Sequence, residues 1–264
     1  MLRQRVITAL VLIPLLLGAL FVLPRSGGAI AIGLLFLAGA YEWGGFFGNG
    51  GLPQRVAYAT TALVVIAVLF ILAGDPQVLK LVAALATLFW VGSLVLIARY
   101  PLRIPTAAVV VTGLAAISFA AVCLMRLHLD WQRGPELLLF IFVLVWAADI
   151  GAFFTGRAIG RRKLAPAVSP GKTWEGVFGG MLLAALAAVG GSLWFGHQPA
   201  WFPLCVAVAA ISVVGDLTVS IFKRNAGLKD SGSIFPGHGG VLDRVDSITA
   251  AGPVFVFGVL VIGL

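Results

Sequence analysis

Long apolar runs constrain this chain more than any other feature. They are about 18 to 22 residues long, close to the ~20 apolar residues that an α-helix needs to cross a bilayer. About nine such spans can be drawn, separated by segments rich in Pro, Gly and Asn. They cover residues 6–23, 29–47, 56–73, 78–98, 106–124, 136–154, 175–194, 201–222 and 247–264. The runs predict an all-α, polytopic membrane protein, because a membrane span must satisfy its own backbone hydrogen bonds.

The composition leaves no room for a soluble module. Of 264 residues, 61% are hydrophobic and the mean hydropathy is +1.08. We expect a single transmembrane domain over 1–264, with N-terminal helices to about 135 and a motif-bearing catalytic half from about 136 to 264. The net charge of +8 does not indicate nucleic acid, because the basic residues are not interleaved with aromatic ones.

The basic residues predict the orientation instead. With a cytoplasmic N-terminus, 14 of the 18 lysines and arginines lie on the cytoplasmic side. They are Arg3, Arg5, Arg55, Arg99, Arg103, Arg157, Arg161, Arg162, Lys163, Lys172, Lys223, Arg224, Lys229 and Arg244. Such an asymmetry favours the segmentation as well as this orientation, because a miscounted span would scramble it. We expect a multi-pass protein of the inner membrane.

The first span has a second reading, as a cleaved signal peptide. We favour a retained helix, because the apolar stretch exceeds the usual ~7–15 residues and no strong Ala-x-Ala site follows. The two cysteines, Cys123 and Cys205, lie in apolar runs, and we expect buried core residues rather than a disulfide. Glu42 lies near the cytoplasmic end of its span, where it either snorkels to the surface or belongs to a distant site.

The stretch from Asp216 to Asp246 is the most charged part of the chain. Only 11% of all residues are charged, yet this window holds four aspartates, four basic residues and one of three histidines. Unpaired charge is costly to bury, so burial does not explain this density. We expect the chemistry here.

Two acids lie inside spans, and both are close to the basic loops. Asp149 precedes Arg157 by eight residues and Asp216 precedes Lys223 by seven, which places both carboxylates roughly 10–12 Å inward. Intramembrane acids are functional by default, so we expect a shared polar cavity that opens to the cytoplasm. Asp216, Ser220 and Lys223 also share one helix face.

The spacing of the last two aspartates indicates a metal site. Asp243 and Asp246 lie three residues apart and face the same way on a helix, and Asp216 adds a third hard oxygen ligand. Such a set suits Mg²⁺, with water or substrate phosphate completing its coordination. The alternative is an ion-pair network with Lys223 and its basic neighbours, and the two readings are compatible.

Two loops add candidate anion-binding groups. Pro236-Gly-His238-Gly-Gly240 exposes backbone N–H groups to phosphate oxygens. Residues 155–174 end in Gly171-Lys172-Thr173, which is not a P-loop because Pro166 occupies the required glycine position. We predict Ser169 as a helix N-cap, which would place Lys172 at a helix N-terminus. The four basic residues 157 and 161–163 fix topology or meet lipid headgroups, and we favour topology.

A family resemblance covers these motifs. Ser220-Ile-Phe-Lys-Arg, Lys229-Asp230-Ser-Gly and Pro236-Gly-His-Gly-Gly-Val-Leu-Asp-Arg-Val-Asp246 together resemble the signature of the phosphatidate cytidylyltransferases, or CDP-diacylglycerol synthases. Trp146-Ala-Ala-Asp149 and Ser169-Pro-Gly-Lys-Thr-Trp-Glu-Gly176 are also typical of that family. The resemblance implies transfer of CMP from CTP to phosphatidic acid, with pyrophosphate released. It also implies Mg²⁺, beside it a monovalent cation such as K⁺, and a homodimer that no residue pattern indicates.

The resemblance implies roles for single residues. The metal centre would be Asp216, Asp243 and Asp246. The other catalytic residues would be Lys223, Arg224, Lys229, Asp230, His238 and Arg244. The substrate-binding residues would be Asp149, Ser169, Lys172, Thr173, Glu175, Ser220, Gly239 and Gly240. No general base is required, since a phosphate monoester is already a nucleophile at neutral pH.

Two rival functions remain at this point. A transporter for an anionic substrate would show internal repeats and polar residues reaching both membrane faces, and the sequence shows neither. A related transferase acting on another lipid phosphate would carry nearly the same motifs.

Overall fold

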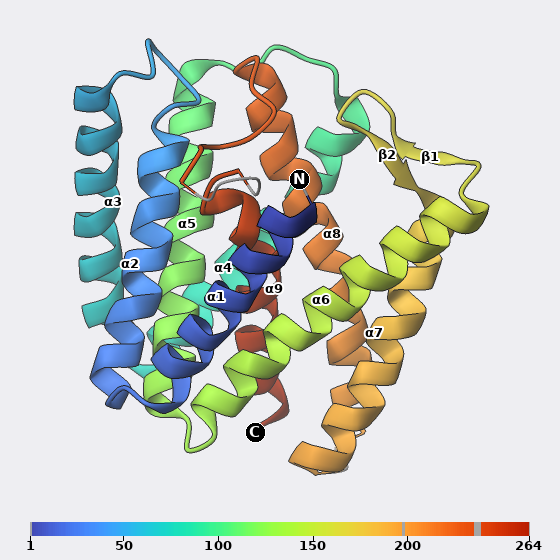
Figure 1. The fold of residues 1–264 in the computed structure, drawn as a ribbon. Coiled ribbons are helices and arrows are strands. Elements are labelled where there is room, and N and C mark those ends of the chain that lie inside the picture. The colour runs from blue at the N-terminus through green and yellow to red at the C-terminus, as the bar shows by residue number, and fades with distance from the viewer. Residues whose placement is uncertain (1, 197–198, 235–238, 264) are drawn as a thin grey trace.

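The computed structural model describes residues 2–196, 199–234 and 239–263, with only the backbone for residues 2–9 (Figure 1). The elements are α1 (Leu2–Phe21), α2 (Arg25–Trp43), α3 (Leu52–Leu72), α4 (Pro76–Arg99), α5 (Thr106–Asp130), α6 (Gly134–Ile159), β1 (Lys163–Ala165), β2 (Ser169–Thr173), α7 (Trp174–Phe195), α8 (Trp201–Asn225) and α9 (Leu242–Ile262).

The helices confirm an all-α polytopic membrane fold. Within the described residues, eight helices, α2 to α9, are long and apolar enough to cross a membrane. The apolar stretch described in α1, Leu10–Val22, is shorter, so the first span stays a prediction. Cys123 and Cys205 are both buried in the core, as predicted.

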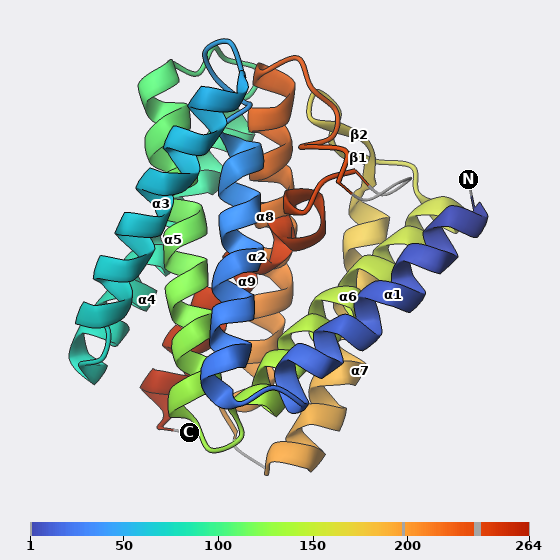
Figure 2. The same ribbon diagram turned by 60° about the vertical axis from the view of Figure 1, so that its left-hand side comes forward.

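The connections alternate between the two ends of the bundle. Figures 1 and 2 show the segments after α2, α4, α6 and α8 at one end, together with the start of α1. This end, called the site end below, carries the basic loops. The alternation is the one on which the predicted charge asymmetry depends.

Helix α9 forms the centre of the bundle. It packs against α8, α4 and α5. Of the residues in its apolar 18-residue stretch, 72% are buried, whereas the corresponding share in the peripheral α3 is 17%. Near the site end, α8 and α9 approach closely at Gly215, where an added Cβ would lie 2.8 Å from Ala250 Cβ and from the Asp246 carbonyl oxygen. A side chain there would push apart the two helices that carry the aspartates.

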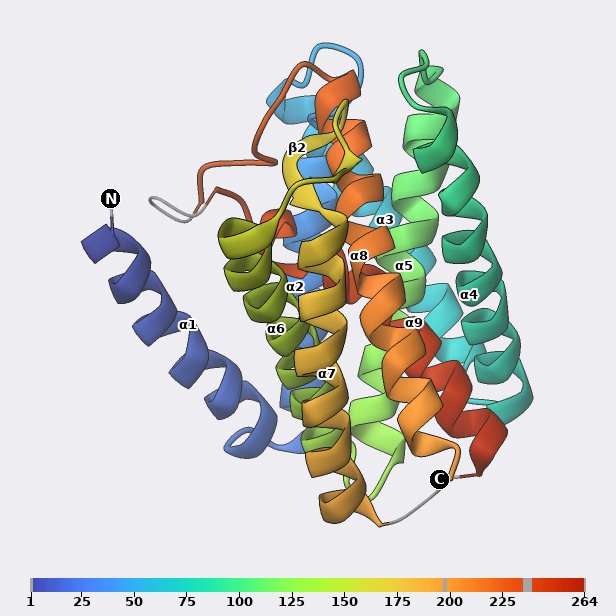
Figure 3. The same ribbon diagram turned by 90° about the vertical axis from the view of Figure 1, so that its right-hand side faces the viewer.

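Helices α6 and α7 form a second tight pair, seen side by side in Figure 3. An added Cβ on Gly180 would lie 2.5 Å from the Ala148 carbonyl oxygen, and one on Gly151 would lie 2.5 Å from the Gly179 carbonyl oxygen. Glycines on facing helices allow the backbones to approach, as is common inside membranes. The pair positions Asp149 on α6 beside the β-hairpin that precedes α7.

Candidate active site

Lys223 joins the two helices that carry the charged window. Its ammonium nitrogen lies 2.7 Å from Asp243 Oδ1 and 3.8 Å from Asp246 Oδ2, and the lysine is buried. Helix α9 begins at Leu242, five residues before the predicted span, so both aspartates lie within its first turns and face α8. A buried lysine between two carboxylates compensates charge that would otherwise be costly to place there.

A second lysine–aspartate pair lies beside the first. Lys172 Nζ is 2.6 Å from Asp216 Oδ2, and each side chain is 27% exposed. Ser220 donates a hydrogen bond of 3.2 Å to Asp216 Oδ1, as the i, i+4 spacing predicts. The pair is accessible enough for Lys172 to exchange its partner for a ligand.

The predicted N-cap at Ser169 is wrong. Ser169–Thr173 is strand β2, which pairs antiparallel with Lys163–Ala165, and Thr173 is the N-cap of α7, accepting from the Gly176 N–H at 3.1 Å. Lys172 therefore extends from a strand rather than from a helix terminus. The hairpin is favoured because Ala165 and Val168 pack into a small core with Leu217 and Ile221 of α8.

Two side chains hold this hairpin in place. Glu175 accepts backbone hydrogen bonds from Arg161 and Arg162 at 3.1 and 3.2 Å. Arg224 donates to the carbonyl of Val168 at 3.3 Å and to that of Leu228 at 3.0 Å. Arg224 thus links the hairpin to the loop after α8, and its guanidinium contacts the protein rather than an open surface.

The loop between α8 and α9 closes on Asp243. Its Oδ2 accepts from the backbone N–H groups of Ser231 and Gly240, both at 2.9 Å. Gly239 has φ +77°, a conformation that other residues rarely adopt. His238 and the preceding Pro236 lie outside the described residues.

Glu42 is the site residue whose role the sequence left open. Its carboxylate is 1% exposed and accepts three hydrogen bonds: from the Ser231 hydroxyl at 2.7 Å and from the N–H groups of Val241 and Leu242 at 2.9 Å. It therefore caps the N-terminus of α9 and anchors the same loop that Asp243 holds. A charged residue within an apolar run was the only sequence signal.

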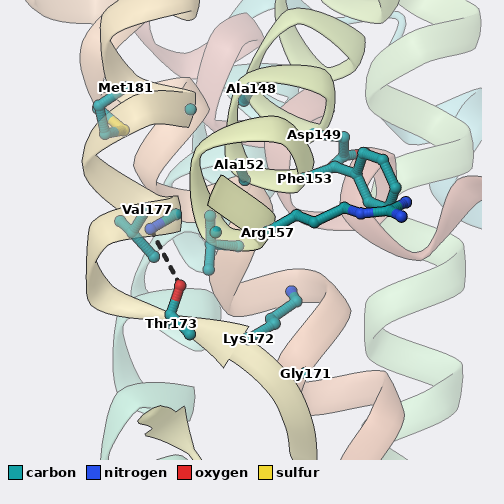
Figure 4. A pocket seen from close by; sticks show the side chains of 14 residues that line it. Ala148, Asp149, Ala152, Phe153, Arg157, Gly171, Lys172, Thr173, Val177 and Met181 are labelled. Atoms are coloured by element: carbon teal, nitrogen blue, oxygen red, sulfur yellow. Dashed lines mark hydrogen bonds between the residues drawn. The ribbon is translucent and has the colours of Figure 1, made fainter. Parts of the chain in front are cut away.

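Asp149 lines a cavity rather than the lipid face alone. The cavity has a volume of about 440 Å³ and lies among α6, α7 and the end of β2, with Val213 of α8 in its wall (Figure 4). Lys172 and Arg157 line it too. Asp216 is not among the residues that line this cavity, but Lys172 connects the two, since it lines the cavity and contacts Asp216 at 2.6 Å.

The remaining candidates lie around this region. Lys229 and Asp230 are exposed on the loop after α8, and Arg244 is exposed on the first turn of α9. Thr173 and Glu175 serve the start of α7 and the hairpin, as described above.

The carboxylates of Asp216, Asp243 and Asp246 are suitable ligands for a hard cation. In this structure, however, they are not arranged around a common point where a cation could bind. Carboxylate oxygens are ligands that Mg²⁺ accepts. Both oxygens of Asp216 and of Asp243, however, already accept from protein donors. Among the described residues, no three Asp, Glu, His or Cys side chains lie together as a metal site would require. Metal binding would need the lysines to move from the carboxylates.

Comparisons with known proteins show the family to which the chain belongs. Residues 3–262 match the model of the cytidylyltransferase family. The chain is 43% identical to a phosphatidate cytidylyltransferase of Pseudomonas aeruginosa, over 97% of this chain and 96% of that protein. It is 42% identical to the phosphatidate cytidylyltransferase of Haemophilus influenzae, over 97% and 98% of the two chains. A relative of the same name from Brucella suis is 44% identical over 56% of each chain. The chain is a member of the cytidylyltransferase family.

Proposed function

We propose that the chain is a phosphatidate cytidylyltransferase, which converts CTP and phosphatidic acid to CDP-diacylglycerol and pyrophosphate in phospholipid biosynthesis. The observation that carries the proposal is the pair of lysine–aspartate contacts, Lys172–Asp216 and Lys223–Asp243, at one end of a bundle of membrane-length helices. A site of this kind can bind phosphates from water beside an apolar surface. The names of the relatives support the choice of substrates.

The transfer is a substitution at phosphorus. An oxygen of the lipid phosphate forms a bond to the α-phosphorus of CTP, and the bond from that phosphorus to the bridging oxygen breaks. The electron pair of the broken bond leaves with pyrophosphate. Catalysis of this type depends on positioning and charge stabilisation, so the site needs cations more than a base.

The cationic side chains divide by exposure. Lys223 is buried and orders Asp243 and Asp246, whereas Lys172 is partly exposed and can turn to a phosphate. Lys229 and Arg244 are exposed at the same end, where a triphosphate would arrive from water. His238 would lie near the leaving pyrophosphate, a role that rests on the family resemblance.

We include Mg²⁺ in the proposal, held by Asp216, Asp243 and Asp246, with a monovalent cation such as K⁺ beside it. The ion would supply positive charge to the triphosphate when bound.

We further propose an inner-membrane location with the site end facing the cytoplasm, and a homodimer. The orientation follows from the basic loops. It can be measured with a Lys163→Cys variant, since the two native cysteines are buried. A membrane-impermeant maleimide should label intact spheroplasts only after permeabilisation; labelling before it would reverse the orientation.

The function is tested by pyrophosphate release from purified protein in detergent, with CTP, phosphatidic acid and Mg²⁺. Release should require both substrates and should vanish in Asp243→Asn, because the single amide oxygen of Asn cannot accept both from Lys223 and from the two backbone N–H groups. Asp130→Asn, an exposed aspartate in the last turn of α5, is the control. Equal rates with ATP would remove the cytidine assignment, and no release with any lipid phosphate from folded protein would refute the enzyme.

A further inference from the structure

The cavity among α6, α7 and α8 has two chemically different walls. At about 440 Å³ it falls within the ~300–1,000 Å³ typical of ligand pockets. Asp149, Arg157 and Lys172 line one part of it, and Val177, Met181 and Val213 line another. A lipid with a phosphate headgroup fits both walls, because its phosphate needs the cations and its acyl chains need an apolar surface.

Arg157 differs from its basic neighbours. Five basic residues lie in 155–174, and two of them, Arg157 and Lys172, line the cavity. The other three, Arg161, Arg162 and Lys163, do not. Figure 4 shows its side chain extended from α6 beside Phe153, on the side away from Val177 and Met181. No hydrogen bond or ion pair joins the Arg157 guanidinium to the part of the chain that the structure describes.

This combination bears on the role of Arg157. Membrane topology would be satisfied by any basic residue in the loop. The topology explanation does not require an arginine that lines a cavity and whose guanidinium N–H groups make no hydrogen bond to the described residues of the protein. A guanidinium presents several N–H groups in a planar fork that matches the oxygens of a phosphate.

The position of Lys172 connects the cavity to the aspartates. The lysine lines the cavity and also contacts Asp216 at 2.6 Å, on the helix that carries Lys223. A phosphate bound between Arg157 and Lys172 would therefore lie on the α6 side of Asp216. The exposed Lys229 and Arg244, at the same end of the bundle, would remain for the triphosphate of the nucleotide.

We propose that this cavity is the acceptor subsite, which binds the phosphate monoester of the lipid through Arg157 and Lys172 and part of its apolar portion against Val177, Met181 and Val213. The proposal rests on the cytidylyltransferase function proposed above and separates the two substrates within that site. Arg157 is then a substrate-binding residue, not a topology signal alone.

The test is a kinetic comparison in detergent mixed micelles. The mole fraction of dioleoyl phosphatidic acid is varied at saturating CTP, and CTP is varied at saturating lipid. Arg157→Gln should raise the KM for phosphatidic acid about 10-fold or more, the loss expected for a hydrogen bond to a charged group. The KM for CTP should stay within about twofold of wild type, since Arg157 would touch only the acceptor.

Matched variants separate charge, position and packing. Arg161→Gln removes a neighbouring charge that does not line the cavity and should behave as wild type. Arg157→Lys keeps the positive charge but loses the planar guanidinium, so its KM for phosphatidic acid should lie between those of wild type and Arg157→Gln. Met181→Trp places a larger side chain in the apolar wall and so narrows the cavity without changing its charge. It should also raise the KM for phosphatidic acid. This last variant decides the matter if Arg157→Gln does not fold.

Two results would overturn the proposal. One is an unchanged KM for phosphatidic acid in both Arg157→Gln and Met181→Trp. The other is a raised KM for CTP instead, which would make the cavity the nucleotide site. Competition by glycerol 3-phosphate as strong as that by dioctanoyl phosphatidic acid would show a site for free phosphate and refute the lipid portion.

A binding measurement keeps this proposal distinct from the enzyme function. Native mass spectrometry can compare phosphatidic acid retained by wild type and Arg157→Gln, with phosphatidylcholine of the same chains as reference. Selective retention that is lost in the variant would support the subsite even if no pyrophosphate is released. Equal retention by both proteins, from a wild type that is active, would refute the subsite alone.

Discussion

The carboxylate of Glu42 accepts a 2.7 Å hydrogen bond from the hydroxyl of Ser231, across 189 residues of sequence. Glu42 lies in the last turn of α2, and Ser231 lies in the loop that leads to Asp243. The neighbouring Trp43 packs against Phe222 with ring centroids 5.1 Å apart, which fixes the end of α2 against α8. Glu42 therefore acts on the site through the loop and the first turn of α9.

Glu42→Gln should lower both activity and stability. Whichever way the amide is turned, its NH₂ group must face the N–H of Val241 or Leu242, because each carboxylate oxygen accepts from one of them. An unsatisfied buried donor costs about 1–3 kcal/mol. Thermal unfolding and pyrophosphate release should show this loss, with kcat falling more than either KM changes.

Ser231→Ala is the matched control for Glu42→Gln. It removes one hydrogen bond to Glu42 and leaves the two backbone bonds in place, so a smaller loss is expected. A Glu42→Gln variant as stable and active as wild type would show that the capping contacts contribute nothing to the site.

Gly240→Ala should inactivate the protein for a steric reason. An added Cβ would collide with both oxygens of Glu42 and with the Ser231 hydroxyl. Either the loop or the buried carboxylate must then shift, and overpacking typically costs about 1–3 kcal/mol. Pyrophosphate release and unfolding temperature measure the effect.

Gly190→Ala tests whether the effect is local. Gly190 lies within α7, and nothing surrounds the place where its Cβ would be. Alanine there should be neutral or stabilising by up to about 1 kcal/mol, because it lowers the entropy cost of the helix. Equal losses from both glycine variants would contradict the steric explanation.

Substitutions of Arg224 should reveal what its guanidinium does. Because it donates to the carbonyls of Val168 and Leu228, a lysine with a single ammonium should not replace it. Arg224→Lys and Arg224→Gln should both lower the rate by about 10-fold or more through loss of two hydrogen bonds. If Arg224→Lys alone kept the wild-type KM for CTP and the wild-type rate, direct contact with phosphate would be the better explanation.

Magnesium should stabilise the folded protein through the aspartates. A ligand at 100 times its Kd adds about 2.7 kcal/mol to the unfolding free energy. The unfolding temperature should therefore rise with Mg²⁺ and fall again with EDTA. Asp246→Asn should abolish this dependence, because Asp246 is placed in the proposed metal set, while Asp130→Asn should retain it. A rise that persists in Asp246→Asn would locate the metal elsewhere.

Short-range features were predictable from the sequence. The apolar runs predicted about nine spans, and within the described residues eight of them are helices long enough to cross a membrane. The Asp216–Ser220 contact followed from i, i+4 spacing on one helix. The same local reasoning was wrong at Ser169, because the pairing of Lys163 with Thr173 competes with a helix there, and a strand partner lies outside any local window.

The sequence by itself determined the spans, their alternation and the segment that holds the aspartates, because helix hydrogen bonds and burial in lipid depend on neighbouring residues. Only the tertiary structure decided which charges meet. Lys172 reaches Asp216 from a strand, and Glu42 reaches Ser231 from another helix. An acid within an apolar run must find a partner to offset its desolvation, but its identity depends on how the helices pack.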